Sequence, residues 1–175
     1  QIGTATITVT VEDGGLDGDL SSTSDNATTS QTFTVTVSPI NDLPTLAVLS
    51  NLTLDEDASE QTVSLSGITA GGSESQPLAI TASSSNTGLI PNPAISYASA
   101  ESTGSLKFTP TSEQSGSTVI TVTVKDGGLD GDLSTAIDNA TTSLTFTVTV
   151  NPINNLPTLA ALSNLTLVEN ADEQT

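Results

Sequence analysis

The sequence predicts an all-β protein made of tandem antiparallel β-sandwich repeats. Two observations lead to this prediction: apolar residues alternate with threonine and serine over long stretches, and the chain repeats itself at a spacing of 113 residues. No segment sustains the three-to-four-residue apolar spacing of an amphipathic helix. The fold class therefore follows from periodicity at two length scales.

Alternation is clearest in two segments near the end of the chain. In STVITVTV, Ile120, Val122 and Val124 share one face, and in SLTFTVTV the residues from Leu144 to Val150 alternate in the same way. A period of two is typical of half-buried strands. Shorter runs with this period occur at Leu52 and Leu54, Val63 and Leu65, Leu78 to Ala82, Ile95 and Tyr97, and Leu106 and Phe108. About seven short strands in a unit of roughly a hundred residues indicate an immunoglobulin-like sandwich.

The repeat is read from two recurring stretches. DGGLDGDL occurs at 13–20 and 126–133, and DLPTLAVLSNLTL at 42–54 returns as NLPTLAALSNLTL at 155–167. At this shift, residues 1–62 and 114–175 agree at about three quarters of positions, which indicates a tandem duplication. We expect residues 1–43 to be the C-terminal part of a preceding repeat, 44–156 one complete sandwich with its outgoing linker, and 157–175 the start of the next repeat. Neighbouring chain should complete the two partial repeats, because their apolar faces are otherwise open.

Composition limits the classes of function. The net charge is −18 with only two lysines, which argues against nucleic acid and anionic membranes as partners. No apolar run reaches the roughly 18 residues of a membrane span. Without His or Cys there is no Ser-His or Cys-His nucleophile, and the carboxylates fall in polar glycine-rich turns, so we expect no enzyme. A carbohydrate-binding module normally uses exposed aromatic platforms, and Tyr97 alone does not make one.

Four stretches together resemble a known family: PINDLPTL at 39–46, DED at 55–57, LKFTPTSEQSGSTVITVTVKDGG at 106–128, and TFTVTV at 145–150. They are similar to the bacterial cadherin-like and immunoglobulin-like tandem repeats of giant surface adhesins. The resemblance implies an extracellular or cell-surface spacer that projects a distal binding domain. It also implies calcium at domain junctions, bound by acidic residues of adjoining domains and by the linker between them.

Chain geometry suggests where such calcium sites would lie. The loop between the last two strands, 126–142, should face the incoming linker, and the turn after the first strand should face the outgoing one. Calcium accepts six to eight oxygen ligands in irregular geometry. The candidate ligands at the incoming junction are Asn41, Asp42, Asp126, Asp130, Asp132 and Asp138. Those at the outgoing junction are Asp55, Glu56, Asp57, Glu113, Asn154 and Asn155, and the first copy of the loop adds Asp13, Asp17, Asp19 and Asp25.

The second junction departs from this pattern. Asn155 replaces the acid found at Asp42, Val168 replaces Asp55, and Asn170 stands where the first copy has Asp57. These changes remove charge, although Glu169 persists. We therefore expect a weaker calcium site at that junction.

Other interpretations remain open from the sequence. Glycine and aspartate are ordinary turn residues, so DGGLDGDL can be a solvated loop tip without an ion. It also resembles the nonapeptide of calcium-binding parallel β-rolls, but Asp17 replaces a glycine and no copy follows nine residues later. The DED stretch can block edge pairing of strands. Lys107 alternates with apolar neighbours and should point to solvent, which argues against an isopeptide bond. A self-assembling extracellular filament, in which other copies of the chain complete the partial repeats, is the alternative to a spacer.

Overall fold

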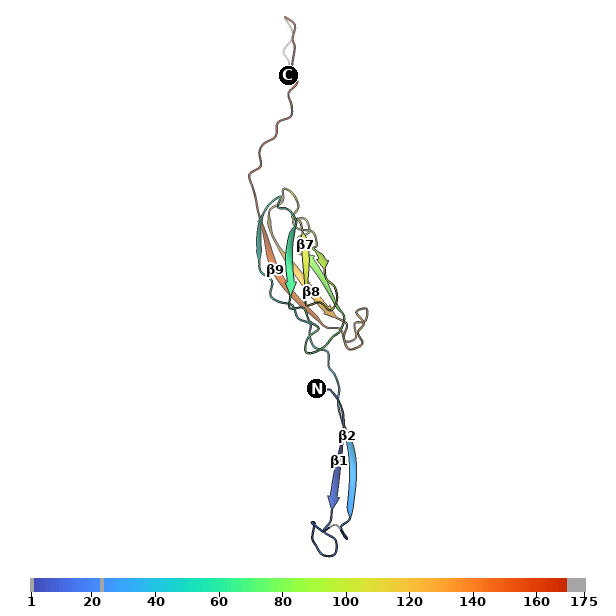
Figure 1. Ribbon diagram of the computed structural model, residues 1–175. Helices are drawn as coiled ribbons and strands as arrows, with labels where there is room; N and C mark the ends of the chain where they lie inside the picture. The colour runs from blue at the N-terminus through green and yellow to red at the C-terminus, as the bar shows by residue number, and fades with distance from the viewer. Residues whose placement is uncertain (1, 23, 170–175) are drawn as a thin grey trace.

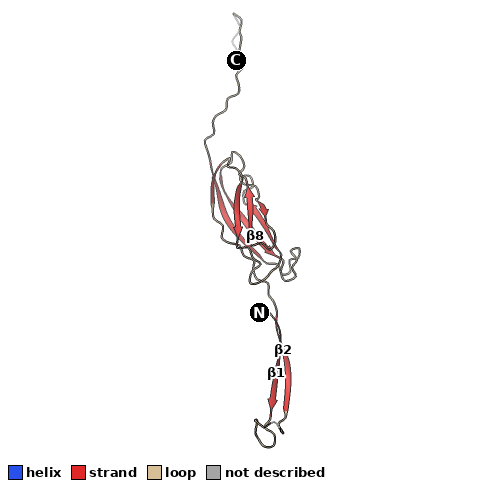
Figure 2. Ribbon diagram, in the orientation of Figure 1, coloured by secondary structure: helices blue, strands red, loops and turns tan. Residues whose placement is uncertain are grey.

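The computed structural model describes residues 2–22 and 24–169, and over these residues the chain forms strands and loops without a helix (Figure 2). None of the described segments is therefore a helix that could cross a membrane. The predicted all-β class is confirmed. The strands are β1 (Gly3–Glu12), β2 (Thr28–Val37), β3 (Leu52–Asp55), β4 (Gln61–Ser66), β5 (Leu78–Ser84), β6 (Ala94–Ser96), β7 (Thr103–Phe108), β8 (Gly116–Asp126) and β9 (Thr141–Asn151).

Strands β3 to β9 form the sandwich. One sheet has the order β3-β9-β8-β5 and the other the order β4-β7-β6. The alternation predicted for β8 and β9 places Ile120, Val122 and Val148 in the core with no exposed surface. The other layer adds Leu65, Leu106 and Phe108 to the same apolar cluster, among others. The core thus consists mainly of aliphatic side chains from the inner faces of the two sheets.

One strand pairing in the sandwich is parallel. Strand β3 runs beside β9 with Leu52 opposite Val148 and Asp55 opposite Asn151. The incoming linker reaches the sandwich at the end where β9 begins, so β3 runs in the direction of β9. The remaining strand pairs are antiparallel.

Strands β1 and β2 form a separate hairpin below the sandwich (Figure 1). Its register matches that of β8 and β9, because Gly3 lies opposite Val37 as Gly116 lies opposite Val150. Burial differs sharply between the two copies: Phe33 is 55% exposed in the hairpin, whereas its counterpart 113 residues later is 2% exposed. The hairpin therefore has the backbone pairing of the repeat without its core. The domain boundaries given above remain predictions.

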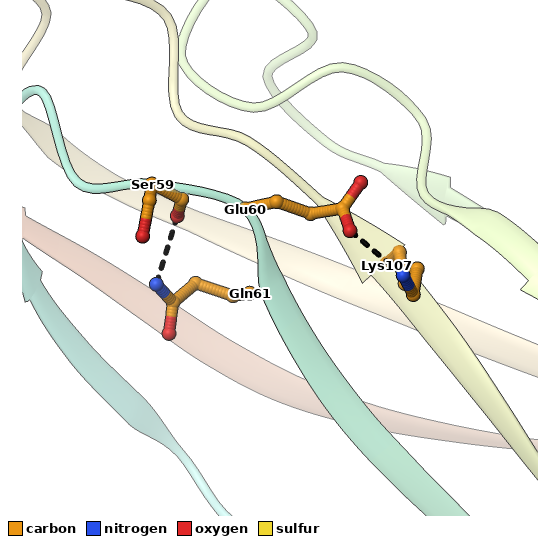
Figure 3. Close-up of polar contacts among 4 residues, drawn as sticks. All are labelled: Ser59, Glu60, Gln61 and Lys107. Atoms are coloured by element: carbon orange, nitrogen blue, oxygen red, sulfur yellow. Dashed lines mark hydrogen bonds and ion pairs between the residues drawn. The ribbon is translucent and has the colours of Figure 1, made fainter.

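Lys107 on β7 points to solvent, as its alternation predicts. Its Nζ lies 2.8 Å from Oε1 of Glu60, and the two side chains are 49% and 55% exposed (Figure 3). Exposed ion pairs contribute between nothing and about 1 kcal/mol to stability. The sandwich is therefore held by its core and backbone pairing, and this pair adds little.

The duplication offers a matched test of the core. Ile120→Ala should lower the free energy of unfolding of the sandwich by about 2–5 kcal/mol, because it leaves a cavity in the core between the two sheets. Ile7→Ala makes the same change in the hairpin, where the side chain is 40% exposed. It should change the sandwich's unfolding by less than about 0.5 kcal/mol. Urea denaturation followed by circular dichroism measures both, and equal losses would contradict the assignment of the core.

Candidate junction sites at the two ends of the sandwich

A buried carboxylate closes the loop between β8 and β9. Asp126 follows Val122 and Val124 on the inward face of β8 and has no exposed surface. Its Oδ1 accepts hydrogen bonds from the backbone N–H groups of Gly128 (3.0 Å) and Ala140 (2.8 Å). A buried charge is costly unless it is hydrogen-bonded. The loop supplies these donors, and Asp126 in turn ties its two ends together.

The incoming linker is fastened to the same carboxylate. Nδ2 of Asn41 lies 3.2 and 3.3 Å from the two carboxylate oxygens of Asp126, and 2.8 Å from the backbone oxygen of Asp138. Oδ1 of Asn41 accepts a hydrogen bond from Nε2 of Gln76 at 2.7 Å. Both ends of the amide are therefore used. We call this end of the sandwich the proximal pole.

Asp42 lies against a different loop, the one that follows β4. Its backbone N–H donates to Oε2 of Glu74 at 3.2 Å, and Gln76 donates to the same oxygen at 3.0 Å. A Cβ at Gly72 would collide with the Asp42 carboxylate. Glu74 and Gln76 were missed from the sequence, because an irregular loop has no periodicity to place its side chains. The only available signal was an acidic residue shortly after Gly71 and Gly72.

The other loop acids bond mainly to their own loop. Asp130 Oδ1 accepts from the N–H of Asp132 at 2.8 Å, and Asp132 Oδ1 accepts from the N–H and hydroxyl of Ser134 at 2.8 and 2.7 Å. Asp138 Oδ2 accepts from the N–H of Leu129 at 2.7 Å. Asp130 and Asp132 are exposed and make no hydrogen bond to the linker within the described residues. These carboxylates therefore shape the loop directly.

The first copy of the loop repeats this network. Asp13 accepts from the N–H groups of Gly15 and Ala27, both at 3.0 Å. Asp25 accepts from Leu16 at 2.8 Å. Asp17 accepts from the N–H of Asp19 at 2.9 Å, and Asp19 accepts from Ser21 at 2.8 Å. Because the hairpin has no sandwich around it, the loop conformation is a local property of the sequence.

Hydrogen bonding lowers the pKa of three of these acids. For Asp132 the hydroxyl of Ser134 is the largest cause, Ser21 acts likewise on Asp19, and for Asp13 the backbone N–H of Ala27 comes first. A lowered pKa in the folded chain favours the ionised form. The stability it contributes is present above the ordinary aspartate pKa of about 4 and is lost as the pH falls through the lowered pKa.

Two buried oxygens of the loop between β8 and β9, which we call the proximal loop, have no hydrogen-bond partner. They are Oδ1 of Asp138 and Oδ1 of Asn139, and Oδ1 of Asn26 is the counterpart of the latter in the hairpin. The oxygens of Asp138 and Asn139 would both collide with a Cβ at Gly128, so only glycine at this position leaves space beside them. In the described part of the chain, no three or more acidic side chains are grouped to hold a metal ion. Side chains alone thus offer two free oxygens at this point.

The opposite end of the sandwich, the distal pole, fastens the outgoing linker. Oε1 of Glu56, which is 8% exposed, accepts from the N–H of Ile153 at 3.0 Å. Nδ2 of Asn155 donates to Oε2 of Glu113 at 2.8 Å. The N–H of Glu113 in turn donates to Oδ1 of Asp57 at 3.1 Å. The two acidic turns predicted to face this linker are thus brought together with it.

The remaining distal candidates contribute less. Nδ2 of Asn151 lies 3.5 Å from Oδ1 of Asp55, at the limit of a hydrogen bond. Asn154 makes no hydrogen bond within the described residues. Val168 and Glu169 are exposed. The substitution at Asn170 lies outside the described residues.

Comparison with known proteins gives limited information. No protein-family model and no curated protein matches the chain. Domains 4 and 5 of the surface-layer protein SbsC match at 17% identity and a TM-score of 0.42, over 86% of this chain and 58% of theirs. A structure of its domains 1–6 matches at 17% identity and a TM-score of 0.43, over 88% of this chain and 17% of that one. Similarity at this level establishes neither a common fold nor a common function.

The role of Asp126 is testable by substitution. Asp126→Ala should lower the free energy of unfolding of the sandwich by about 2–4 kcal/mol, since each buried donor left without an acceptor costs about 1–3 kcal/mol. Asp130→Ala removes an exposed acid from the same loop and should cost less than about 0.5 kcal/mol. Chemical denaturation of both variants gives the comparison. Similar losses would mean that Asp126 is not the group that ties the loop to the sandwich.

Proposed function

We propose that the chain is a calcium-stiffened structural spacer segment of a long bacterial surface or secreted adhesin. The observation that supports this role most strongly is that linkers are hydrogen-bonded at both poles of one sandwich. Asn41 binds the proximal pole, and Ile153 and Asn155 bind the distal pole. Linkers bonded to the domain at both ends cannot turn freely, so the orientation of one domain restricts the orientation of the next.

The strand arrangement supports a role under tension. The chain enters the sandwich through β3 at the proximal pole and leaves through β9 at the distal pole, and these two strands are paired in parallel. Pulling the two linkers apart loads the β3–β9 hydrogen bonds in shear, so several must break together. The carboxylate of Glu56 adds a bond between the distal turn and the backbone of Ile153. The unit is therefore suited to hold its length under load.

The proximal loop has oxygen atoms that could serve as calcium ligands. Asp138 and Asn139 present the two buried, unpartnered oxygens, and hard oxygen ligands are those that calcium prefers. Backbone carbonyls and water would have to complete the shell. Calcium bound here would add positive charge to a loop whose acids are otherwise balanced by hydrogen-bond donors and, at Asp132, by the ammonium of Lys125. Because Asn41 donates to the backbone oxygen of Asp138, an ion at Asp138 would lie next to the attached linker.

The two linkers differ in their need for a cation. Asn155 donates a hydrogen bond to the Glu113 carboxylate, which needs no ion. The same repeat position in the incoming linker is Asp42. An aspartate in place of Asn155 would set two carboxylates side by side at Glu113, and these would repel each other unless a cation lay between them. We infer that a junction with aspartate at this linker position, as at Asp42, depends on calcium. A junction with asparagine there, as at Asn155, is held by the hydrogen bond that the amide donates to Glu113.

Calcium should stabilise the sandwich through the proximal loop. Thermal melting should shift upward with calcium, because binding to the folded state alone adds about 2.7 kcal/mol at a hundredfold excess over the dissociation constant. Asp138→Asn should weaken the binding measured by calorimetric titration.

A second variant tests the linker at the distal pole. Asn155→Asp should lower the melting temperature in chelator, and calcium should restore it.

Magnesium at the same concentration is the control, and it should have a smaller effect because it keeps its water. Gln76→Ala is a matched variant that loosens Asn41 without removing a proposed calcium ligand. Calcium affinity should be nearly unchanged in it. If calcium neither binds nor raises the melting temperature of the unaltered chain, the loop acids act only on their own backbone.

A filament subunit is the second candidate function. In that role other copies of the chain, rather than neighbouring repeats, would cover the apolar residues of the two partial repeats, among them Phe33 (55% exposed) and Leu162 (84% exposed). A carbohydrate-binding role has less support, because Tyr97 packs against the core and presents no exposed platform.

A further inference from the structure

We propose that Asp130–Gly131 is a site of spontaneous isomerisation, at which the main chain passes from the α-carboxyl group to the side-chain carboxyl group of Asp130. The octapeptide at 126–133, where β8 ends and the proximal loop begins, contains two Asp–Gly pairs. The structure encloses the first pair and leaves the second open to solvent. This modification would limit the chemical lifetime of the loop, and it requires neither calcium nor the spacer role.

The reaction needs no partner other than water. The backbone nitrogen of Gly131 forms a bond to Cγ of Asp130, and one carboxyl oxygen leaves as water with the amide proton and a proton from solvent. Water then opens the cyclic succinimide and returns a proton to solvent. Opening between Cγ and the nitrogen restores aspartate, whereas opening between the main-chain carbonyl carbon and the nitrogen gives isoaspartate. One water molecule leaves and one enters, so the composition is unchanged and nothing is oxidised or reduced.

Two conditions control this reaction in a folded chain. The side-chain carboxyl group must swing onto the nitrogen of the next residue, and the peptide that follows must be free to turn toward it. Glycine in the second position favours the approach, because it has no Cβ and adopts a wide range of backbone angles. A peptide held by packing and hydrogen bonds reacts only when the surrounding structure opens. The environments of the two Asp–Gly pairs therefore decide which one reacts.

The carboxylate of Asp130 is free to move. Asp130 and Gly131 are both exposed. Oδ1 of Asp130 accepts a hydrogen bond from the N–H of Asp132 at 2.8 Å, and Oδ2 accepts one from the hydroxyl of Thr135 at 3.1 Å. Both bonds are made at the surface by the loop itself, where water replaces them at little cost. The side chain can therefore leave its place without any movement of the sandwich.

The attacking nitrogen is also accessible. The N–H of Gly131 donates to the backbone oxygen of Gly128 at 3.3 Å, which is long for such a bond. Beside Gly131 there is open space, since a Cβ at this position would meet only Cδ of Pro77, at 3.9 Å, apart from its chain neighbours. Both reacting groups of the second pair are thus loosely held.

The surroundings of Asp126 prevent the same reaction. Its carboxylate has no exposed surface, accepts hydrogen bonds from two backbone N–H groups of the loop, and lies 3.2 and 3.3 Å from the amide nitrogen of Asn41. The peptide that follows is packed as well, because a Cβ at Gly127 would lie 2.9 Å from the carbonyl carbon of Gly131. Attack on Cγ would require these bonds and this packing to be given up together. Only the second pair is therefore free to react while the sandwich stays folded.

Isomerisation would change the loop without releasing the linker. Isoaspartate adds one methylene group to the main chain and turns the former α-carboxyl group into a free carboxylate. The extra atom falls where the two limbs of the loop meet, beside the close approach of Gly127 and Gly131. The N–H of Asp132 loses the acceptor that Asp130 provided. Asp126 and its bonds to the linker lie outside the altered segment.

Peptide mapping of aged protein tests this assignment. The folded chain is kept for weeks at neutral pH with chelator, and isoaspartate is located by electron-transfer fragmentation, which distinguishes it from aspartate. Isoaspartate should form at Asp130 at least about tenfold faster than at Asp126, because Asp126 reacts only through opening of the sandwich. In urea, where both pairs are solvated, the two rates should converge. Equal rates in the folded chain, or no isoaspartate at Asp130 in the folded chain, would overturn the proposal.

A variant separates the geometry of the loop from the reactivity of the carboxyl group. Asp130→Asn enters the same succinimide with loss of ammonia, so the folded variant should convert to aspartate and isoaspartate faster than the unaltered chain isomerises. Asn139 is the internal control, since its Nδ2 donates to the backbone oxygens of Asp132 and Thr135 and its amide should stay intact. An intact amide at position 130 in the folded variant would show that the loop holds the peptide out of reach, and would overturn the proposal. Equal loss of the amides at 130 and 139 would also overturn it.

Discussion

The structure depends on one buried carboxylate at the end of a strand. The period of two that places Ile120, Val122 and Val124 in the core also places Asp126 on the inward face. An acid there is tolerable only if donors surround it. The loop supplies two backbone N–H groups and the linker supplies the Asn41 amide. The strand, the loop and the incoming chain are therefore coupled through the need to satisfy a single side chain.

The duplicated loop separates local from tertiary causes. Asp13 and Asp126 accept the same two backbone hydrogen bonds, although the hairpin around Asp13 is exposed throughout. The local sequence thus determines the turn. Burial of the carboxylate and attachment of Asn41 require the sandwich. A junction in a tandem array can therefore form only after the domain that it joins has folded.

Much of this architecture could be predicted from the sequence. Alternation located the strands, and the position of the 126–142 loop at the end reached by the incoming chain predicted that Asn41 and Asp126 would be neighbours. Side-chain contacts in irregular loops could not be predicted, because they depend on backbone angles that have no periodic signature. Glu74 and Gln76 were missed for this reason. So was the use of Asp130 and Asp132 as acceptors for their own loop.

The most direct test of the central claim is the hydrogen-exchange rate of the Ala140 amide, with the Ala27 amide in the same chain as reference. Both donate to an aspartate at the same repeat position. If the Asp126 carboxylate joins the loop to the folded core, Ala140 should exchange only through unfolding of the sandwich, orders of magnitude more slowly than Ala27. Comparable exchange at the two amides would show that the loop opens independently of the sandwich, and would contradict this account.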